Sequence, residues 1–125
     1  MYVDVKIPEQ AIADMMVTVI EGNHMVRAWC SGVRLVSHQQ ITWKHPWYSD
    51  PRVWLENFVL EVDEFSDEEG KHHTHRIRIQ NFKDGIARMA ETDAKHFGDW
   101  LNEDYDIVTA DVWFQHIVLG EVRYG

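Results

Sequence analysis

The chain has 125 residues, of which 45% are hydrophobic, and its formal net charge is -9, from 21 acidic and 12 basic residues. This length predicts a single domain over residues 1–125, and the hydrophobic content excludes an intrinsically disordered chain. Cys30 is the only cysteine, which excludes an intrachain disulfide, and the acidic balance argues against direct nucleic-acid binding, because such binding depends on neutralising phosphates.

Residues 8–21 predict an amphipathic helix, with Pro8 at its first position and Gly22 at its end. Five apolar side chains recur at helical spacing: Ile12, Met15, Met16, Val19 and Ile20. We expect this face to lie in the core.

Residues 25–37 are interpreted as a strand or a bent hairpin, in which Gly32 marks a bulge or a turn. The positions before this glycine alternate: Val26, Ala28 and Cys30 on one face, and Arg27, Trp29 and Ser31 on the other.

Residues 37–52 show no periodicity, but they contain three large aromatic side chains, Trp43, Trp47 and Tyr48. Exposed tryptophan lowers solubility, so these rings either fold down as a lid on the core or form a contact surface. Both alternatives stay open from the sequence alone.

Residues 53–65 and 72–79 predict the two strands of an antiparallel hairpin, joined by a turn at 66–70. The alternation of side chains is consistent between the two strands. A register in which Leu60 and Val62 face Ile77 and Ile79 also places acidic side chains opposite basic ones. The charged set is Glu61 and Asp63 with Arg76 and Arg78.

A middle helix is expected from Asn81, its cap, to Trp100. Its buried side comprises Phe82, Ile86, Met89, Phe97 and Leu101, whereas Thr92, Asp93 and Lys95 face water.

The last twenty residues, 106–125, predict a capped helix, a glycine stop at Gly120 and a short strand or tail. Asp106 and Thr109 are both candidate caps. The apolar arc of this helix is wide, so we expect it to lie centrally, with Asp111 and Gln115 buried and in need of partners. In the simplest interpretation Asp111 serves the helix N-terminus and Gln115 bonds a neighbouring backbone.

Together these elements predict an α+β fold, in which an antiparallel sheet of three or four strands is packed by an N-terminal, a middle and a C-terminal helix. Apolar runs are too short to span a bilayer, and no signal peptide opens the sequence, so we expect no membrane partner.

No catalytic motif, bound metal or cofactor is predicted. His72, His73 and His75 cluster near an acidic turn, but no third ligand is fixed by spacing, and a solvated, pH-sensitive edge is the simpler interpretation. Cys30 has apolar neighbours of the same parity, which is typical of a buried small hydrophobe rather than a nucleophile.

Several segments resemble a family of small bacteriophage and prophage proteins. The closing pattern is Asp104-x-Asp106-x-x-Thr109-Ala110-Asp111-Val112-x-x-Gln115, followed by Gly120-Glu121 and Tyr124-Gly125. Ile20-Glu21-Gly22, Trp29, residues 82–87, Met89-Ala90 and His96-Phe97 are similar as well. Small acidic phage proteins without a catalytic motif are often inhibitors of host machinery, so the resemblance implies a class of function rather than a reaction.

The leading hypothesis is therefore a non-enzymatic phage accessory protein in the host cytoplasm that binds and inhibits a host protein, as an anti-defence protein does. Its predicted partner-binding residues are aromatic and acidic: Trp43, Trp47, Tyr48, Asp67, Glu68 and Glu69. A homodimer is also expected, because symmetric dimers are the commonest assembly.

Three alternatives remain. One is a homo-oligomeric sponge for a signalling nucleotide, with arginines on the phosphates and an aromatic ring on the base: Arg27, Arg34, Arg76, Arg78, Arg123 and Trp29. The others are a structural or assembly protein of the virion and a metal-dependent enzyme built on the histidine cluster.

Overall fold

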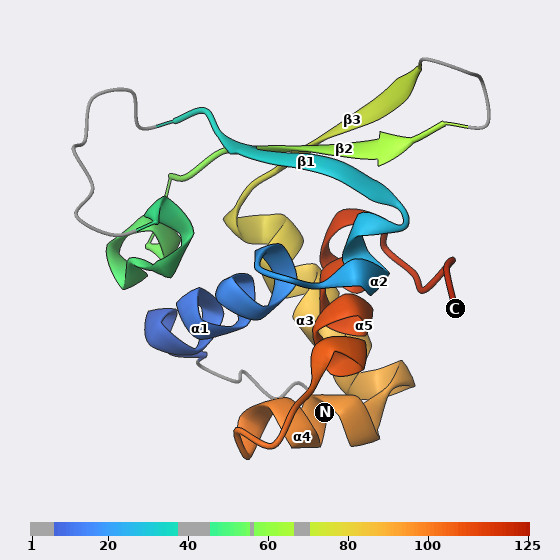
Figure 1. Ribbon diagram of the computed structural model, residues 1–125. Coiled ribbons are helices and arrows are strands. Elements are labelled where there is room, and N and C mark those ends of the chain that lie inside the picture. The colour runs from blue at the N-terminus through green and yellow to red at the C-terminus, as the bar shows by residue number, and fades with distance from the viewer. Residues whose placement is uncertain (1–6, 38–45, 56, 67–70) are drawn as a thin grey trace.

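The computed structural model describes residues 7–37, 46–55, 57–66 and 71–125. In this part of the chain, a three-stranded antiparallel sheet of order β1-β2-β3 lies over a layer of helices, and the helices cover one face of the sheet (Figure 1). The α+β prediction is confirmed. The helices are α1 (Glu9–Ile20), α2 (His24–Arg27), α3 (Ile79–Thr92), α4 (Ala94–Leu101) and α5 (Ile107–Val118), with two 3-10 turns, η1 (Trp47–Ser49) and η2 (Pro51–Trp54).

The sheet consists of β1 (Cys30–Leu35), β2 (Leu60–Phe65) and β3 (His72–Ile77). The register of β1 on β2 shifts between Cys30 and Gly32, which confirms the predicted irregularity at this glycine. Alternate side chains of β2 point to the two faces, so Leu60 and Val62 are buried against the helices.

The hairpin of β2 and β3 is confirmed, but its predicted pairing is only half right. Leu60 does face an isoleucine, Ile77, and Glu61 an arginine, Arg76, but Val62 faces His75, so the register differs by two residues from the one that pairs both Leu60 and Val62 with isoleucines. Asp63 faces Thr74 instead of an arginine, and its carboxylate binds Arg34 from β1. The prediction fails beyond Ile77 because the chain leaves the sheet there and begins α3.

Helix α1 buries the predicted apolar face, and Gly22 follows it with φ +69. Pro8 is the residue before the helix rather than its first position. This difference of one residue changes no contact of the buried face.

Residues 24–27 form a helical turn, α2, where a strand was predicted. The buried side chain of Asn23 causes this outcome, because its Oδ1 accepts the backbone N–H groups of Met25 and Val26 at 3.1 and 3.3 Å. The turn changes the phase of the following residues. Trp29, predicted on the polar face, is therefore buried to 1% exposure, and Ala28 is exposed.

The strand predicted over residues 53–65 begins only at Leu60. Val53 and Trp54 belong to the buried part of η2, where Trp54 packs edge-on against Phe58. The Trp54 indole Nε1 donates a 3.0 Å hydrogen bond to the carbonyl of Tyr48, so this segment is a structured part of the core.

The predicted middle helix is two helices, α3 and α4, which meet at Asp93. Asp93 has non-helical dihedrals, and its carboxylate lies 2.7 Å from Nε2 of the buried His116 in α5. Asn81 is the third residue of α3 and accepts the N–H of Arg78, which is the capping residue. Leu101, predicted buried, is 50% exposed because α4 has turned away from the direction of α3.

Helix α5 is the centre of the helical layer, as predicted, with ten of its twelve residues buried. Asp106, not Thr109, is its cap and accepts the N–H groups of Val108 and Thr109 at 3.0 Å. Helix α3 crosses α5 very closely at Gly85, where an added Cβ would lie 2.6 Å from Cα of Ile117. Only glycine allows this approach of the two backbones.

Candidate partner-binding face

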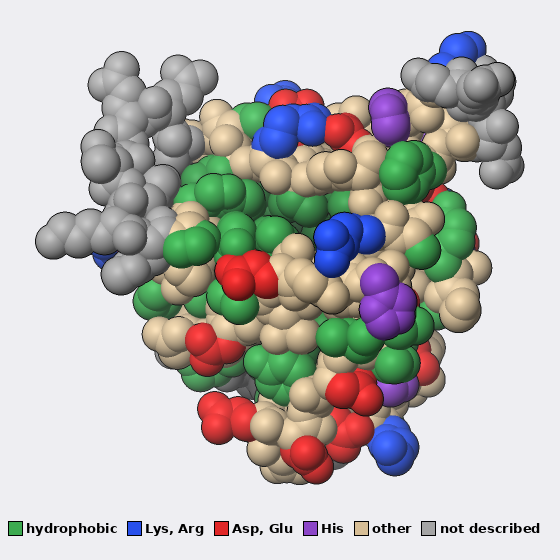
Figure 2. Space-filling view, viewed as in Figure 1, with side chains coloured by type: hydrophobic (Ala, Val, Ile, Leu, Met, Phe, Trp, Pro, Cys, Tyr) green, Lys and Arg blue, Asp and Glu red, His purple; other side chains and the backbone are tan. Residues whose placement is uncertain are grey.

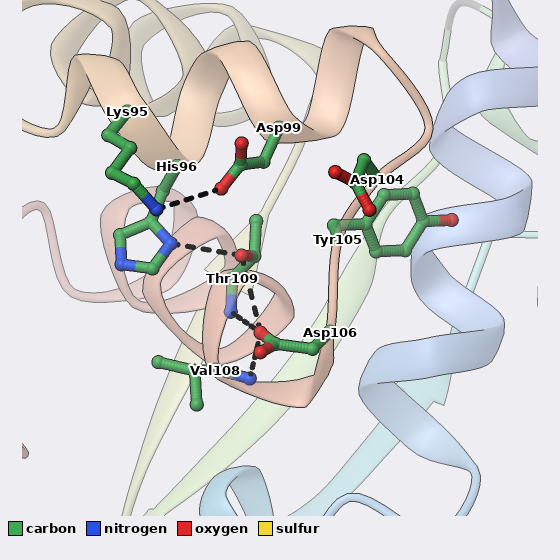
Figure 3. A pocket seen from close by; sticks show the side chains of 8 residues that line it. All are labelled: Lys95, His96, Asp99, Asp104, Tyr105, Asp106, Val108 and Thr109. Atoms are coloured by element: carbon green, nitrogen blue, oxygen red, sulfur yellow. Dashed lines mark hydrogen bonds and ion pairs between the residues drawn. The ribbon is translucent and has the colours of Figure 1, made fainter.

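The start of α5 and the neighbouring α4 enclose a shallow hollow of about 290 Å³ (Figure 3). Three carboxylates line it, from Asp99, Asp104 and Asp106, together with a single cationic side chain, Lys95. Lys95 lies 3.6 Å from Asp99. The three negative charges and one positive charge leave the rim with a net charge of about -2, which suits a guanidinium or ammonium group.

Hydrogen bonds connect the residues on the α5 side of this hollow to α4 and to the helix start. Oγ1 of the buried Thr109 lies 2.9 Å from Nδ1 of His96, which joins α5 to α4. Hydrogen bonds from the backbone of Thr109 and Val108 lower the pKa of Asp106 below its ordinary value. Asp106 therefore stays ionised at neutral pH while it caps the helix.

Tyr105 connects the hollow to α1. Figure 3 shows its hydroxyl pointing away from the carboxylates and toward the neighbouring helix, where it is hydrogen-bonded to the side chain of Thr18. Burial raises the pKa of Tyr105, and the nearby charges of Asp14 and Glu103 act in the same direction. The charge of Asp14 on α1 thus lies near Tyr105, which also lines the hollow.

One further contact extends this surface to the aromatic segment. Glu21 directly follows the last residue of α1, seven positions after Asp14. The Tyr48 hydroxyl donates a 2.6 Å hydrogen bond to Oε2 of Glu21. This bond raises the pKa of Tyr48 to about 12, and the phenol is therefore neutral at physiological pH.

We call this surface the acidic face, and it consists of Asp14, Glu21, Tyr48, Asp99, Glu103, Asp104, Tyr105 and Asp106. No lysine or arginine occurs in α1 or between residues 96 and 106. Figure 2 shows acidic side chains gathered at the lower end of the molecule, over α4 and its connection to α5. Apart from Lys95 at the rim of the hollow, the charged residues of this surface are therefore acidic.

Of the three predicted aromatic residues, the structure describes Trp47 and Tyr48, and both contribute to the core and to the surface. Trp47 and Tyr48 are half-buried and pack on the core, with the Trp47 ring 6.1 Å from that of Trp54. Each ring thus covers the core with one side and contributes to the molecular surface with the other. Trp43, Asp67, Glu68 and Glu69 lie outside the described residues, so their predicted role in binding stays a prediction.

The residues of the predicted nucleotide site are not gathered at one opening. Trp29 is buried, its Nε1 donates to Asp111 at 2.8 Å, and its ring is stacked on Tyr124. Arg76 lies on the outer face of the sheet, opposite Glu61.

The other four arginines of that site have separate contacts or positions, and Arg34 binds Asp63 on the sheet. Arg123 lies 3.7 Å from Glu64, whose side chain points to the inner face. Arg27 ends α2, and Arg78 caps α3. Nucleotide binding stays a prediction that would require Tyr124 to leave Trp29.

Glu64 is a second buried carboxylate that the sequence did not single out. Its burial by itself raises the pKa, but hydrogen bonds from Tyr124 and His75 and the charge of Arg123 outweigh burial and lower it. The contacts are 2.6 Å from the Tyr124 hydroxyl and 2.9 Å from His75 Nε2. Alternation along β2 places Glu64 on the buried face, which is the signal in the sequence that could have found it.

The cysteine and two of the clustered histidines are held in packing or hydrogen-bond contacts. Burial raises the pKa of Cys30 to about 11, so its thiol is protonated at neutral pH. His72 lies 3.1 Å from the hydroxyl of Ser31, and His75 binds Glu64. Across the described part of the chain, no three His, Cys, Asp or Glu side chains are grouped so that they could hold a metal ion.

The described helices include none whose length and apolar character would allow it to cross a bilayer. Comparison of the chain with protein-family models, with curated proteins and with solved structures gives no match. The resemblance to phage proteins therefore stays an expectation, and the functional argument depends on the geometry of the acidic face.

Proposed function

We propose that this protein is a non-enzymatic bacteriophage accessory protein that binds and inhibits a basic host protein through the acidic face. The phage origin rests on the similarity of the closing sequence pattern. The binding role is supported chiefly by one observation, the acidic side chains at the hollow of α4 and α5, at Asp14 of α1, and at Glu21, which follows α1 and binds Tyr48 of η1.

A surface of this composition suits a partner rich in lysine and arginine. Opposite charges steer encounter and fix the orientation of two proteins. Tyr48 adds an aromatic surface with a fixed hydroxyl, and tyrosine is enriched at interface positions that carry binding energy. Inhibition follows if the basic surface that is covered is the one the host protein uses for its own ligand.

The proposal is tested by affinity capture from host lysate with the wild-type protein and with the double variant Asp14→Lys/Asp104→Lys. Both residues are exposed, so the variant should keep its melting temperature. We expect the wild type to retain a basic host protein at low salt and to release it as the salt concentration rises, and we expect the variant to retain none.

A matched control reverses two charges outside the face. Asp84 and Glu91 are exposed on α3, and Asp84→Lys/Glu91→Lys changes the net charge by the same amount without touching the acidic face. Capture that survives in the control and is lost in the Asp14→Lys/Asp104→Lys variant supports the proposal. Equal capture by all three proteins, or a captured partner that is not basic, refutes it.

A further inference from the structure

The last residues of the chain fold back beside α5 and occupy a slot in the molecule (Figure 1). The slot is formed around Gln115, which has no exposed surface. Its Oε1 accepts the backbone N–H groups of Arg123 and Tyr124 at 2.8 and 3.0 Å, and its Nε2 donates to the Tyr124 carbonyl at 2.9 Å. One buried amide thus recognises the main chain of two successive residues.

The side chain of Tyr124 is recognised as specifically as its backbone. The ring lies parallel to that of Trp29, with centroids 5.9 Å apart and an angle of 4° between the planes. Its hydroxyl donates a 2.6 Å bond to Oε2 of Glu64, which is 4% exposed. Arg123 adds an ion pair at 3.7 Å to the same carboxylate.

Two of the groups that form the slot, Glu64 and Trp29, are remote in sequence from the segment they hold, whereas Gln115 precedes it by only eight or nine positions. Glu64 precedes Tyr124 by 60 positions, and Trp29 lies between α2 and β1. These contacts therefore need the sequence of residues 123–124 but not its covalent connection to the same molecule. The connection itself reverses direction at Gly120, with φ +78.

We propose that this slot also binds residues 123–124 of a second copy of the chain, so that two molecules exchange these segments reciprocally and form a symmetric dimer. The occupant is a second copy because its segment has the shape, charge and hydrogen-bonding groups that already fit the slot. In the dimer the turn at Gly120 opens, and each slot receives Tyr124 from the partner.

Complementation of two variants is the decisive experiment. Gln115→Met breaks the slot and keeps the segment, while Tyr124→Ala keeps the slot and breaks the segment. Neither variant has a working pair of its own, but a mixed dimer has one. We expect each variant alone to sediment as a monomer, the mixture to contain a heterodimer, and the wild-type dimer fraction to rise with concentration.

The indole N–H resonance of Trp29 reports whether the slot is filled, so an NMR spectrum of the mixture should recover the wild-type signal in the Tyr124→Ala partner. If Gln115→Met fails to fold, Glu64→Gln replaces it as the slot variant. A mixture that remains monomeric overturns the proposal. A Tyr124→Ala protein that dimerises as strongly as the wild type also overturns it, because its dimer would use another surface.

The turn at Gly120 provides an independent test. Its added Cβ would meet only Nη1 of Arg88, at 3.8 Å, so Gly120→Val strains the closed turn through its positive φ rather than through a clash. Two turns open in each dimer, and the dimer dissociation constant should fall by about tenfold or more. An unchanged or higher dissociation constant contradicts the exchange.

Discussion

Trp29 and Asp111 are joined by a 2.8 Å hydrogen bond from the indole Nε1 to Oδ1, although 82 positions separate them in the chain. Both are buried, and Asp111 also accepts a 2.9 Å bond from Nε2 of Gln115. Burial raises the pKa of Asp111, and these two bonds act against that rise. The pair fixes the junction of α2 and β1 to the central helix.

The first prediction concerns this pair. Asp111→Ala should lower the free energy of unfolding by about 2–3 kcal/mol, because it leaves the Trp29 N–H buried without an acceptor and removes one partner of Gln115. The value is measured by urea denaturation followed by far-ultraviolet circular dichroism. Trp29→Phe should lower the free energy of unfolding by less in the Asp111→Ala background than in the wild type, since the two residues act together. Strictly additive losses would contradict this coupling.

The sequence indicated that Asp111 and Gln115 are buried and need partners, and this is confirmed. It could not name the partners. Gln115 does bond a neighbouring backbone, as expected, but Asp111 binds Trp29 rather than the start of α5. Alternation in the predicted strand placed Trp29 with the polar residues, and only the helical turn after Asn23 changes that phase.

The acidic face shows a similar limit. Composition indicated an acidic, aromatic surface, and Tyr48 is part of it. The hollow could not be predicted, because it depends on the separation of α3 and α4 at Asp93, where neither glycine nor proline marks a break. The bond of Asp93 to His116 accompanies the break and is visible only in three dimensions.

The second prediction concerns Asn23, which is fully buried and makes four hydrogen bonds. Its amide nitrogen donates to the carbonyls of Thr18 and Ile107, both at 3.2 Å, while its oxygen caps α2. Asn23→Ala should cost about 2–3 kcal/mol of unfolding free energy, measured by thermal and urea denaturation.

Asn23→Asp is the matched comparison for this residue. It keeps the capping oxygen but places a carboxylate beside two carbonyl oxygens, so it should also be destabilised, by loss of the donor groups. An aspartate variant as stable as the wild type would show that the bonds to Thr18 and Ile107 contribute little.

The third prediction is a pH dependence on the outer face of the sheet. Hydrogen bonds from Arg34 and Thr74 lower the pKa of Asp63 from 3.8 to about 2. Because the folded pKa lies below the ordinary value, Asp63 contributes stability that is present above pH 3.8 and is lost as the pH falls toward 2.

The difference in unfolding free energy between the wild type and Asp63→Asn should therefore shrink as the pH falls from about 5 to about 2. Arg34→Gln should reduce the same pH dependence, since it removes the main cause of the lowered pKa. The measurement is a series of urea unfolding curves at stepped pH. A difference that stays constant over this interval would argue against the ion pair.

The fourth prediction sets two helical glycines against each other. Alanine in place of glycine inside a helix is worth up to about 1 kcal/mol from propensity alone. At Gly98 in α4 an added Cβ meets nothing within 4 Å, so Gly98→Ala should raise the free energy of unfolding by up to about that amount.

At Gly85 the new atom would lie 2.6 Å from Cα of Ile117 and 2.8 Å from the carbonyl oxygen of His116. Both are backbone atoms of α5, so Gly85→Ala must push the central helix away and should lose about 1–3 kcal/mol or more despite the gain in propensity. Thermal denaturation of the two variants beside the wild type decides the matter, and shifts of the same sign would mean that α3 and α5 do not cross at Gly85 as closely as described.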